Sequence, residues 1–144
     1  MDLRYQECSN SLRHYSTQIF KIRTTALVHG LVILILAGKL YIDQVFALLL
    51  YATIAYGILS NFVLLFLHII NYNHFEKLLG TIREIEKDVF AQELSENKRL
   101  PWTWYSDIRG NELWLRLVHY STFILIFLAY IVLILLVGFH RFLY

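Results

Sequence analysis

The six histidines of this chain make metal or haem binding the first chemistry to consider. His29, His68 and His119 each lie in or beside one of three long apolar runs. Three imidazoles can hold a metal ion, and two facing imidazoles can hold haem iron. No two histidines, however, have the HxxxH or HxxEH spacing of a helical metal motif. In membrane helices, histidine more often forms a hydrogen bond to a neighbouring helix. We therefore expect no cofactor, and a haem- or metal-binding membrane subunit is the remote alternative.

Arg23 and His29 form an Arg-x5-His pattern that resembles the motif of HEPN ribonucleases. The resemblance implies that Arg and His side chains of two subunits converge on RNA. His29 lies inside an apolar run long enough to enter a bilayer, where RNA has no access. A net charge of only +2 gives no independent reason to expect nucleic acid. We expect no nuclease activity and no direct nucleic acid partner.

Charged residues between the second and third apolar runs offer no acid–base pair. Arg83 and Glu86, and Glu84 and Lys87, are three residues apart, which is typical of ion pairs on a solvated helix face. The chain has no phosphate-binding glycine loop, nucleophile elbow or zinc motif. The sequence therefore predicts a protein that is not an enzyme.

The composition is that of an integral membrane protein. Of the 144 residues, 58% are hydrophobic and 16% are aromatic. The single cysteine, Cys8, excludes an intramolecular disulfide, and the single proline, Pro101, leaves long helices uninterrupted. We expect one all-α membrane domain that comprises the whole chain, residues 1–144.

Three apolar segments are long enough to cross a bilayer as helices. The predicted transmembrane helices are residues 24–42, 45–70 and 117–139. Residues 39–44 are expected to form a tight turn, so that the first two transmembrane helices make a hairpin. No charged residue occurs in residues 44–75, and the helix is expected to leave the membrane there without stopping.

The second long helix carries one stripe whose chemistry changes along its length. Outside the membrane the stripe is apolar, with steps of three and four residues: Phe75, Leu78, Ile82, Ile85 and Val89. Inside the membrane the same register is small or polar: Thr53, Gly57, Ser60, Asn61, His68 and Asn71. Polar groups are hidden from lipid and apolar groups from water, so one side of the helix faces protein throughout. Packing within the monomer or an oligomer is one interpretation; a water path lined by the polar residues is the other.

The segments on either side of the hairpin are expected to be cytosolic helices that pair antiparallel. Residues 3–23 form an amphipathic helix, and residues 71–96 form a helical, coiled-coil-like extension. The apolar face of the first helix follows steps of three and four residues: Tyr5, Cys8, Leu12, Tyr15, Ile19, Ile22 and Ala26.

Residues 97–111 form an aromatic loop in which the helical pattern ends. Trp and Tyr favour the headgroup level of a bilayer. The predicted membrane-surface anchors are Trp102, Trp104, Tyr105 and Trp114. A partner-binding loop is the alternative, because aromatic residues also anchor protein interfaces.

The distribution of basic residues predicts the orientation. Residues 1–23 hold four Lys or Arg and residues 71–116 hold seven, so eleven of the thirteen lie on one side of the membrane. The basic side is cytoplasmic by the positive-inside rule. We expect a multi-pass protein of the inner (plasma) membrane, with a cytoplasmic N-terminus and an external C-terminus.

The architecture of residues 1–96 resembles the SLATT group, small membrane proteins of bacterial conflict systems. The stretches RHY at residues 13–15 and RTT at residues 23–25 are similar to those of small membrane proteins in prophage and antiviral loci. The membrane accessory proteins of type VI CRISPR systems are a second comparison. The third apolar run departs from a two-span hairpin. The resemblance implies an oligomeric membrane effector, silenced by a cytosolic sensor and released to depolarise the membrane.

Two functional hypotheses follow. The first is a self-associating inner-membrane effector or accessory subunit of an antiviral system, with the stripe at residues 53–71 as subunit contact or pore. The second is a non-enzymatic anchor that recruits a cytosolic partner protein through the face at residues 75–89. The expected partners are the lipid bilayer, further copies of the chain and a cytosolic protein.

Overall fold

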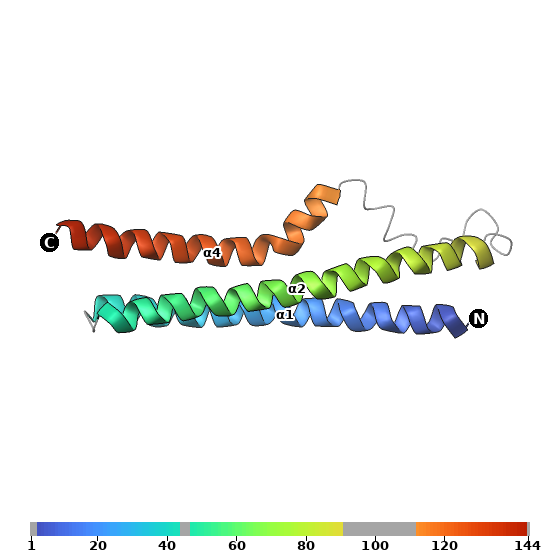
Figure 1. Ribbon diagram of the computed structural model, residues 1–144, viewed down its shortest axis with the longest axis horizontal. Coiled ribbons are helices and arrows are strands. Elements are labelled where there is room, and N and C mark those ends of the chain that lie inside the picture. Colours follow the sequence, from blue (N-terminus) through green and yellow to red (C-terminus); the bar gives the residue numbers. More distant parts are fainter. Residues whose placement is uncertain (1–2, 44–46, 91–111, 144) are drawn as a thin grey trace. The chain divides into compact units, whose positions relative to one another are not determined.

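The protein is all-helical in the residues that its computed structural model describes, 3–43, 47–90 and 112–143. The elements are α1 (Leu3–Ile42), α2 (Ala47–Phe90) and α4 (Glu112–Leu143), labelled as in Figure 1. Within these ranges neither α1 nor α2 contains proline, so each continues without a break over 40 and 44 residues respectively. The prediction of an all-α chain is confirmed.

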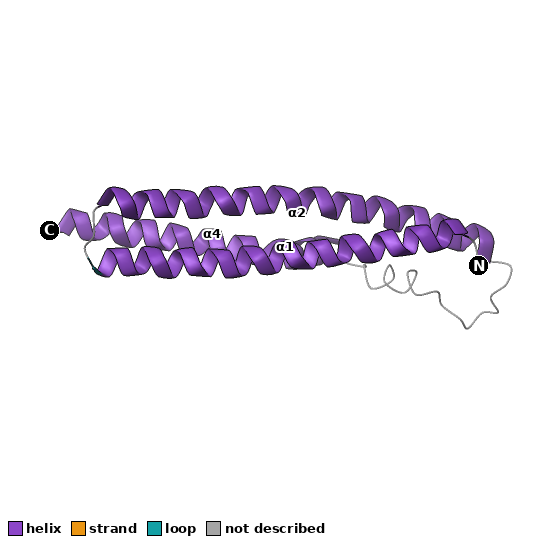
Figure 2. Cartoon of the chain, turned by 90° about the horizontal axis from the view of Figure 1, so that it is seen from below, coloured by secondary structure: helices purple, strands orange, loops and turns teal. Residues whose placement is uncertain are grey.

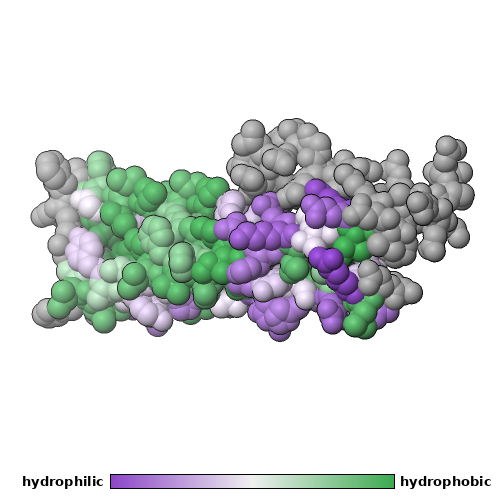
Figure 3. Space-filling model, turned by 45° about the vertical axis from the view of Figure 1, so that its right-hand side comes forward, coloured by the Kyte–Doolittle hydropathy of each residue, from purple (hydrophilic) through white to green (hydrophobic). Residues whose placement is uncertain are grey.

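Three of the described helices are long and apolar enough to cross a membrane, as the sequence predicts. Many large apolar side chains are exposed along them, and one face of the molecule carries a continuous apolar surface (Figure 3). Val32, Ile35 and Leu59, for example, are more than half exposed. A water-soluble monomer rarely exposes so large an apolar patch. Together these features indicate a multi-pass membrane protein.

The end of α1 differs from the tight turn expected at residues 39–44. The helix continues through Lys39 to Ile42, and the Asp43 amide donates a hydrogen bond of 2.9 Å to the Lys39 carbonyl. No glycine or proline lies between Lys39 and Asp43 to stop the helix, and a lysine is favourable in the last turn because of the helix dipole. Of the described residues in the range 39–43, Asp43 is the one that lies in a turn.

The chain divides into two compact units, and α1 and α2 contribute to both. Unit 1 comprises Met1–Phe20 and Ile69–Leu117. In it α1 and α2 lie side by side and antiparallel (Figures 1 and 2), because Tyr5 meets Glu86 while Tyr15 stacks on His74. The buried core combines one face of each helix: Tyr5, Leu12, Ile19, Tyr72, Phe75, Leu79, Ile82 and Ile85. The α1 members belong to the apolar face that the sequence indicates.

Unit 2 comprises Lys21–His68 and Val118–Tyr144, so α1, α2 and α4 all take part. Its buried apolar core draws on each of the three helices: Ala26, Ile33, Ala37, Leu50, Ile54, Phe123, Ile126, Tyr130 and Val137. Two polar residues of α2, Asn61 and His68, are 0% exposed in the same unit. Unit 2 is therefore a three-helix bundle with an apolar outer surface and with two polar residues buried in its interior, where they are hidden from lipid.

Candidate functional site

Gly57 lies where α2 closely approaches both of its neighbours in unit 2, α1 and α4. A Cβ atom at this position would overlap the Tyr130 hydroxyl of α4, and would lie 2.6 Å from Tyr130 Cζ and 2.7 Å from Ile33 Cγ2 of α1. Only glycine leaves room for both side chains. The glycine predicted on the stripe is thus buried where three helices meet.

Ser60 and Asn61 surround the Gly57 carbonyl with hydrogen bonds. Ser60 Oγ donates to that oxygen at 3.0 Å, and Asn61 Nδ2 donates to it at 2.9 Å. His29 Nε2 of α1 lies 3.0 Å from Ser60 Oγ. The tautomer of His29 decides which of these two atoms donates the hydrogen bond. The stripe therefore joins α1 to α2 through polar contacts.

Two polar atoms at this level are buried without a hydrogen-bond partner among the described residues. They are Asn61 Oδ1, an acceptor, and the Tyr130 hydroxyl, which can both donate and accept. Each residue is 0% exposed. An unsatisfied buried polar group costs about 1–3 kcal/mol, so buried groups in folded proteins are normally paired. The centre of unit 2 thus contains two polar atoms that form no hydrogen bond to the described residues around them.

His68 lies in a separate cluster of rings, two helical turns from Asn61 along α2. Its ring centroid is 6.2 Å from that of His119, 5.5 Å from that of Tyr120 and 5.2 Å from that of Phe123, all on α4. His68 is fully buried by these contacts. The packing of α4 on α2 therefore depends on an imidazole as well as on apolar side chains.

Arg23 joins the same cluster from α1. Its Nη2 atom donates a hydrogen bond of 3.2 Å to the Val118 carbonyl of α4, and its guanidinium acts electrostatically on His68. The arginine of the Arg-x5-His pattern thus holds α4, while the histidine of that pattern, His29, contacts Ser60 and Tyr56 instead. Arg23 and His29 have separate partners, and no site that would combine them is formed by these contacts.

The three membrane histidines likewise do not share one site. His68 is adjacent to His119, whereas His29 contacts Ser60 and Tyr56. Among the described residues, no group of three or more His, Cys, Asp or Glu is arranged to hold a metal ion. His29 and His68 have different partners because α1 and α2 run antiparallel, which brings His29 opposite Ser60.

The remaining stripe residues, Thr53 and Asn71, are only partly buried. Thr53 is half-buried and donates a hydrogen bond of 2.8 Å to the Leu49 carbonyl of its own helix. Asn71 is half-buried and belongs to unit 1. The buried part of the polar stripe is thus Gly57, Asn61 and His68, with Ser60 beside it.

The apolar part of the stripe faces α1 within unit 1. Phe75, Ile82 and Ile85 are buried and Leu78 is half-buried against the N-terminal part of α1. Val89 lies in α2, and its side chain is outside the described set, as is that of Trp114 in α4. Trp102, Trp104 and Tyr105 lie outside the described residues altogether. The described part of this face, Phe75 to Ile85, therefore packs on α1 of the same chain.

Glu86 corrects the interpretation of the charged segment as a solvated face. It is only 3% exposed, and its Oε1 accepts a hydrogen bond of 3.1 Å from the Tyr5 hydroxyl. Glu86 follows Leu79 by seven residues and Ile82 by four, so it lies in the register of the buried face. Burial and the Glu86 carboxylate raise the pKa of Tyr5 to about 12. Tyr5 therefore keeps its proton and donates to Glu86 throughout the physiological pH range.

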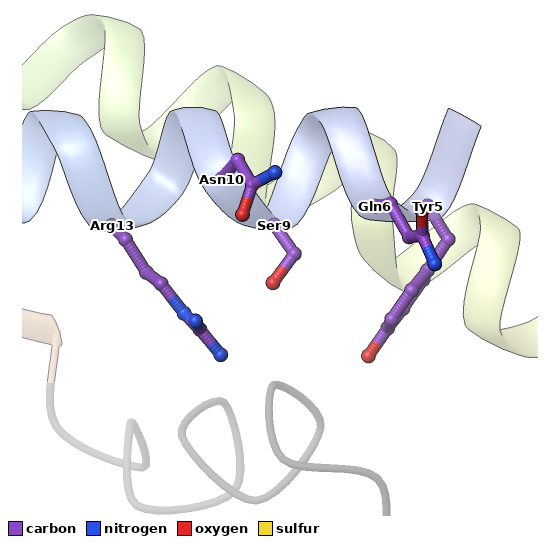
Figure 4. Close-up of a pocket in the computed structure, with 5 residues that line it drawn as sticks. All are labelled: Tyr5, Gln6, Ser9, Asn10 and Arg13. Carbon is purple, nitrogen blue, oxygen red and sulfur yellow. The ribbon is translucent and has the colours of Figure 1, made fainter. Parts of the chain in front are cut away.

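A polar pocket on α1 is the candidate binding surface of unit 1. It is lined by Tyr5 and by the residues one, four, five and eight positions after it, which lie on one face of the helix: Gln6, Ser9, Asn10 and Arg13. Tyr5, Ser9 and Arg13 project to the same side of α1 (Figure 4). The lining groups are hydroxyls, amides and one guanidinium, which is typical of recognition of carboxylate or amide groups.

Searches against protein-family models, curated proteins and solved structures found no match to this chain.

Proposed function

We propose that this chain is a non-enzymatic protein of the bacterial inner membrane that self-associates and perturbs the membrane. Its setting is an antiviral defence system, in which it acts as effector or accessory subunit. The observation that supports the proposal is the pair of buried polar side chains at the centre of unit 2, Asn61 and Tyr130. Asn61 Oδ1 and the Tyr130 hydroxyl have no hydrogen-bond partner among the described residues, and they lie inside a bundle whose outer surface is apolar. Each such group costs about 1–3 kcal/mol, which favours a second state in which it is paired or hydrated.

The second state is reached when α4 separates from α1 and α2. The α2 stripe at Gly57, Asn61 and His68 would then meet lipid, where unpaired polar groups are costly. Stripes from several copies, facing one another, would satisfy those groups and admit water. In this proposal the bundle of a single chain is the silent state, and the oligomer is the active state.

The topology that goes with the function is an α1–α2 hairpin in the membrane with helical extensions in the cytosol. The N-terminus is cytoplasmic and the C-terminus external, as the basic residues of the sequence indicate. The antiparallel contacts of α1 and α2 in unit 1 support the paired extensions. These extensions would receive the signal that releases α4.

Asn61→Leu is expected to abolish depolarisation while leaving membrane insertion intact. Leucine matches asparagine roughly in size, and it removes the amide group of the α2 stripe that an oligomer would pair or hydrate. The measurement is the membrane potential of bacterial cells that express the protein, followed with a potential-sensitive dye. We expect a loss of at least about tenfold in the rate of depolarisation, from a free-energy change of about 1.4 kcal/mol.

Val63→Leu is the matched control, because Val63 is 54% exposed on the same helix two residues away. It is expected to depolarise cells as the wild type does. Wild-type protein that inserts but never depolarises cells, or an Asn61→Leu variant as active as the wild type, would overturn the effector function.

A second candidate function is favoured by the polar pocket of unit 1. The chain would then anchor a cytosolic partner that presents an acidic or amide-rich segment to Gln6, Asn10 and Arg13. Arg13→Glu reverses the charge of that surface without touching the buried core, since Arg13 is exposed. Partner co-purification that is lost in Arg13→Glu, together with normal membrane potential in the wild type, would select this function.

A further inference from the structure

Phe20 is an exposed aromatic residue at the point where the outer surface of α1 changes from polar to apolar. Its side chain is 69% exposed. Leu27 and Leu31 follow it by 7 and 11 positions on the same face of the helix, and both are exposed as well. In the other direction this face carries exposed polar residues, of which Thr17 is the nearest. We propose that lipid acyl chains cover Phe20, so that the membrane-embedded part of α1 begins there and not at residue 24.

The second helix of unit 1 changes from polar to apolar at the same level. The two helices run antiparallel there, with Tyr15 stacked on His74. Phe20 is five positions after Tyr15, so its level on α2 is about five positions before His74, next to Ile70. Ile70 is 37% exposed, and the exposed residues that directly follow it are polar, namely Asn73 and His74. The boundary of a bilayer is a plane, so a membrane accounts for a change at one level on both helices, whereas a protein bound to one helix would not require it.

The length of α1 supports the earlier start of its membrane-embedded part. Ile42, near the other end of the helix, is 77% exposed and lies 22 positions after Phe20, or about 33 Å along the helix. A span from residue 24 to Ile42 measures only about 27 Å, which is less than the hydrocarbon thickness of about 30 Å. The apolar span of α4, Val118–Phe139, has 22 residues and is thus about as long as the span from Phe20. With its start at Phe20, α1 crosses the hydrocarbon core completely.

A boundary at Phe20 places the contact between Arg23 and α4 inside the membrane. Arg23 lies three positions further along α1, or about 4.5 Å deeper. A charged side chain in lipid is unfavourable unless it is paired or extends to the headgroups. Arg23 Nη2 donates to the Val118 carbonyl, and Lys21, exposed beside Phe20, can extend to the headgroups. The hydrogen bond between Arg23 and α4 therefore lies on the lipid side of the boundary, where a water-soluble partner does not reach it directly.

A spin label on Phe20→Cys tests this boundary in the full chain in lipid nanodiscs, with Cys8→Ser to remove the native thiol. Relaxation of the label by oxygen, which enters lipid, is compared with relaxation by a nickel chelate, which stays in water because its polar groups are costly to bury. The ratio of the oxygen effect to the nickel effect is expected to be at least about tenfold higher at Phe20→Cys than at Leu3→Cys. Leu3 is the matched control, because it is an apolar residue of the same helix that is 70% exposed but lies 17 positions before Phe20. The label on Leu31→Cys is expected to give the same ratio as that on Phe20→Cys.

Equal ratios at Phe20→Cys and Leu3→Cys would place Phe20 in water and overturn the boundary. Weak relaxation by both reagents at Phe20→Cys would show that protein covers this position, and it would overturn the boundary too. If Phe20→Cys does not insert, Ile70→Cys and Asn73→Cys test the same level on α2. The ratio is then expected to be higher at Ile70→Cys, and equal ratios at these two positions would contradict the proposal. The labels report position and not membrane activity, so loss of the effector function would leave this result unchanged.

Discussion

Gly57→Leu is expected to loosen α4 from the rest of unit 2 by about 3 kcal/mol. The first side-chain carbon alone would lie 2.6 Å from Tyr130 Cζ and 2.7 Å from Ile33 Cγ2, and leucine adds three further carbons. Neither neighbour can withdraw freely, because Tyr130 and Ile33 are themselves buried in the core. The substitution improves helix propensity by about 1 kcal/mol at most, which is too little to compensate.

The measurement for Gly57→Leu is amide hydrogen exchange of α4 in nanodiscs. About 3 kcal/mol corresponds to roughly a 100-fold increase in exchange rate for amides that open with the bundle. Gly38→Leu and Gly138→Leu are the matched controls, because no atom lies within 4 Å of a Cβ at either position. Equal exchange in Gly57→Leu and both controls would show that α4 does not pack at Gly57.

Ile82→Asp is expected to unfold unit 1. Ile82 is 0% exposed between α1 and α2, so the new carboxylate would be buried without a cation to pair with it in the core cluster. An uncompensated buried charge costs about 3–5 kcal/mol, and the lost apolar contacts add to this. The described core of unit 1 is formed by α1 and α2, and so small a core adds little stability, so the unit should open as a whole.

Limited proteolysis of the nanodisc-embedded protein checks Ile82→Asp. Cleavage within Leu3–Phe20 and at residues 69–86 is expected to accelerate by at least about 100-fold. Lys77→Asp introduces the same carboxylate on the same helix at an exposed position, and it should resist cleavage like the wild type. Protection in Ile82→Asp would contradict the α1–α2 core. Because Ile82 faces α1, loss of a partner in this variant would report unfolding, not a lost contact.

The buried face of each long helix could be predicted from the sequence because a single periodicity determines it. The apolar steps through Leu12 and Ile19 on α1, and through Phe75 and Ile82 on α2, identify the residues that form the core of unit 1. The same register predicts that Asn61 and His68 are buried, because polar side chains of a membrane helix face protein and not lipid. The spacing of residues along one helix depends on that helix alone. Its buried face can therefore be predicted without knowing which segment packs against it.

The pairing of side chains between helices could not be predicted from the same pattern. Glu86 lies in the register of the buried face but has the charge of a surface residue, and its hydrogen-bond partner Tyr5 lies on the other helix of the pair. Tyr130 has no signal of its own within a run of apolar residues, because its contact depends on the absence of a side chain at Gly57. Arg23 could be found only in combination with Val118, a residue 95 positions away. Relative rotation and depth of helices determine these contacts, and periodicity does not specify either.

The central claim, that α4 leaves the bundle for the protein to act, is tested most directly by a reversible lock between α1 and α4. A Cβ at Gly30 would lie 2.9 Å from Ile126 Cγ2, which brings the two positions close enough for a disulfide in Gly30→Cys/Ile126→Cys. Cys8→Ser prevents competing pairs. The measurement is depolarisation of vesicles that contain the oxidised protein, repeated after reduction. We predict that the oxidised protein is silent and that reduction restores depolarisation to the level of the Cys8→Ser protein. Equal depolarisation in both states would contradict the account.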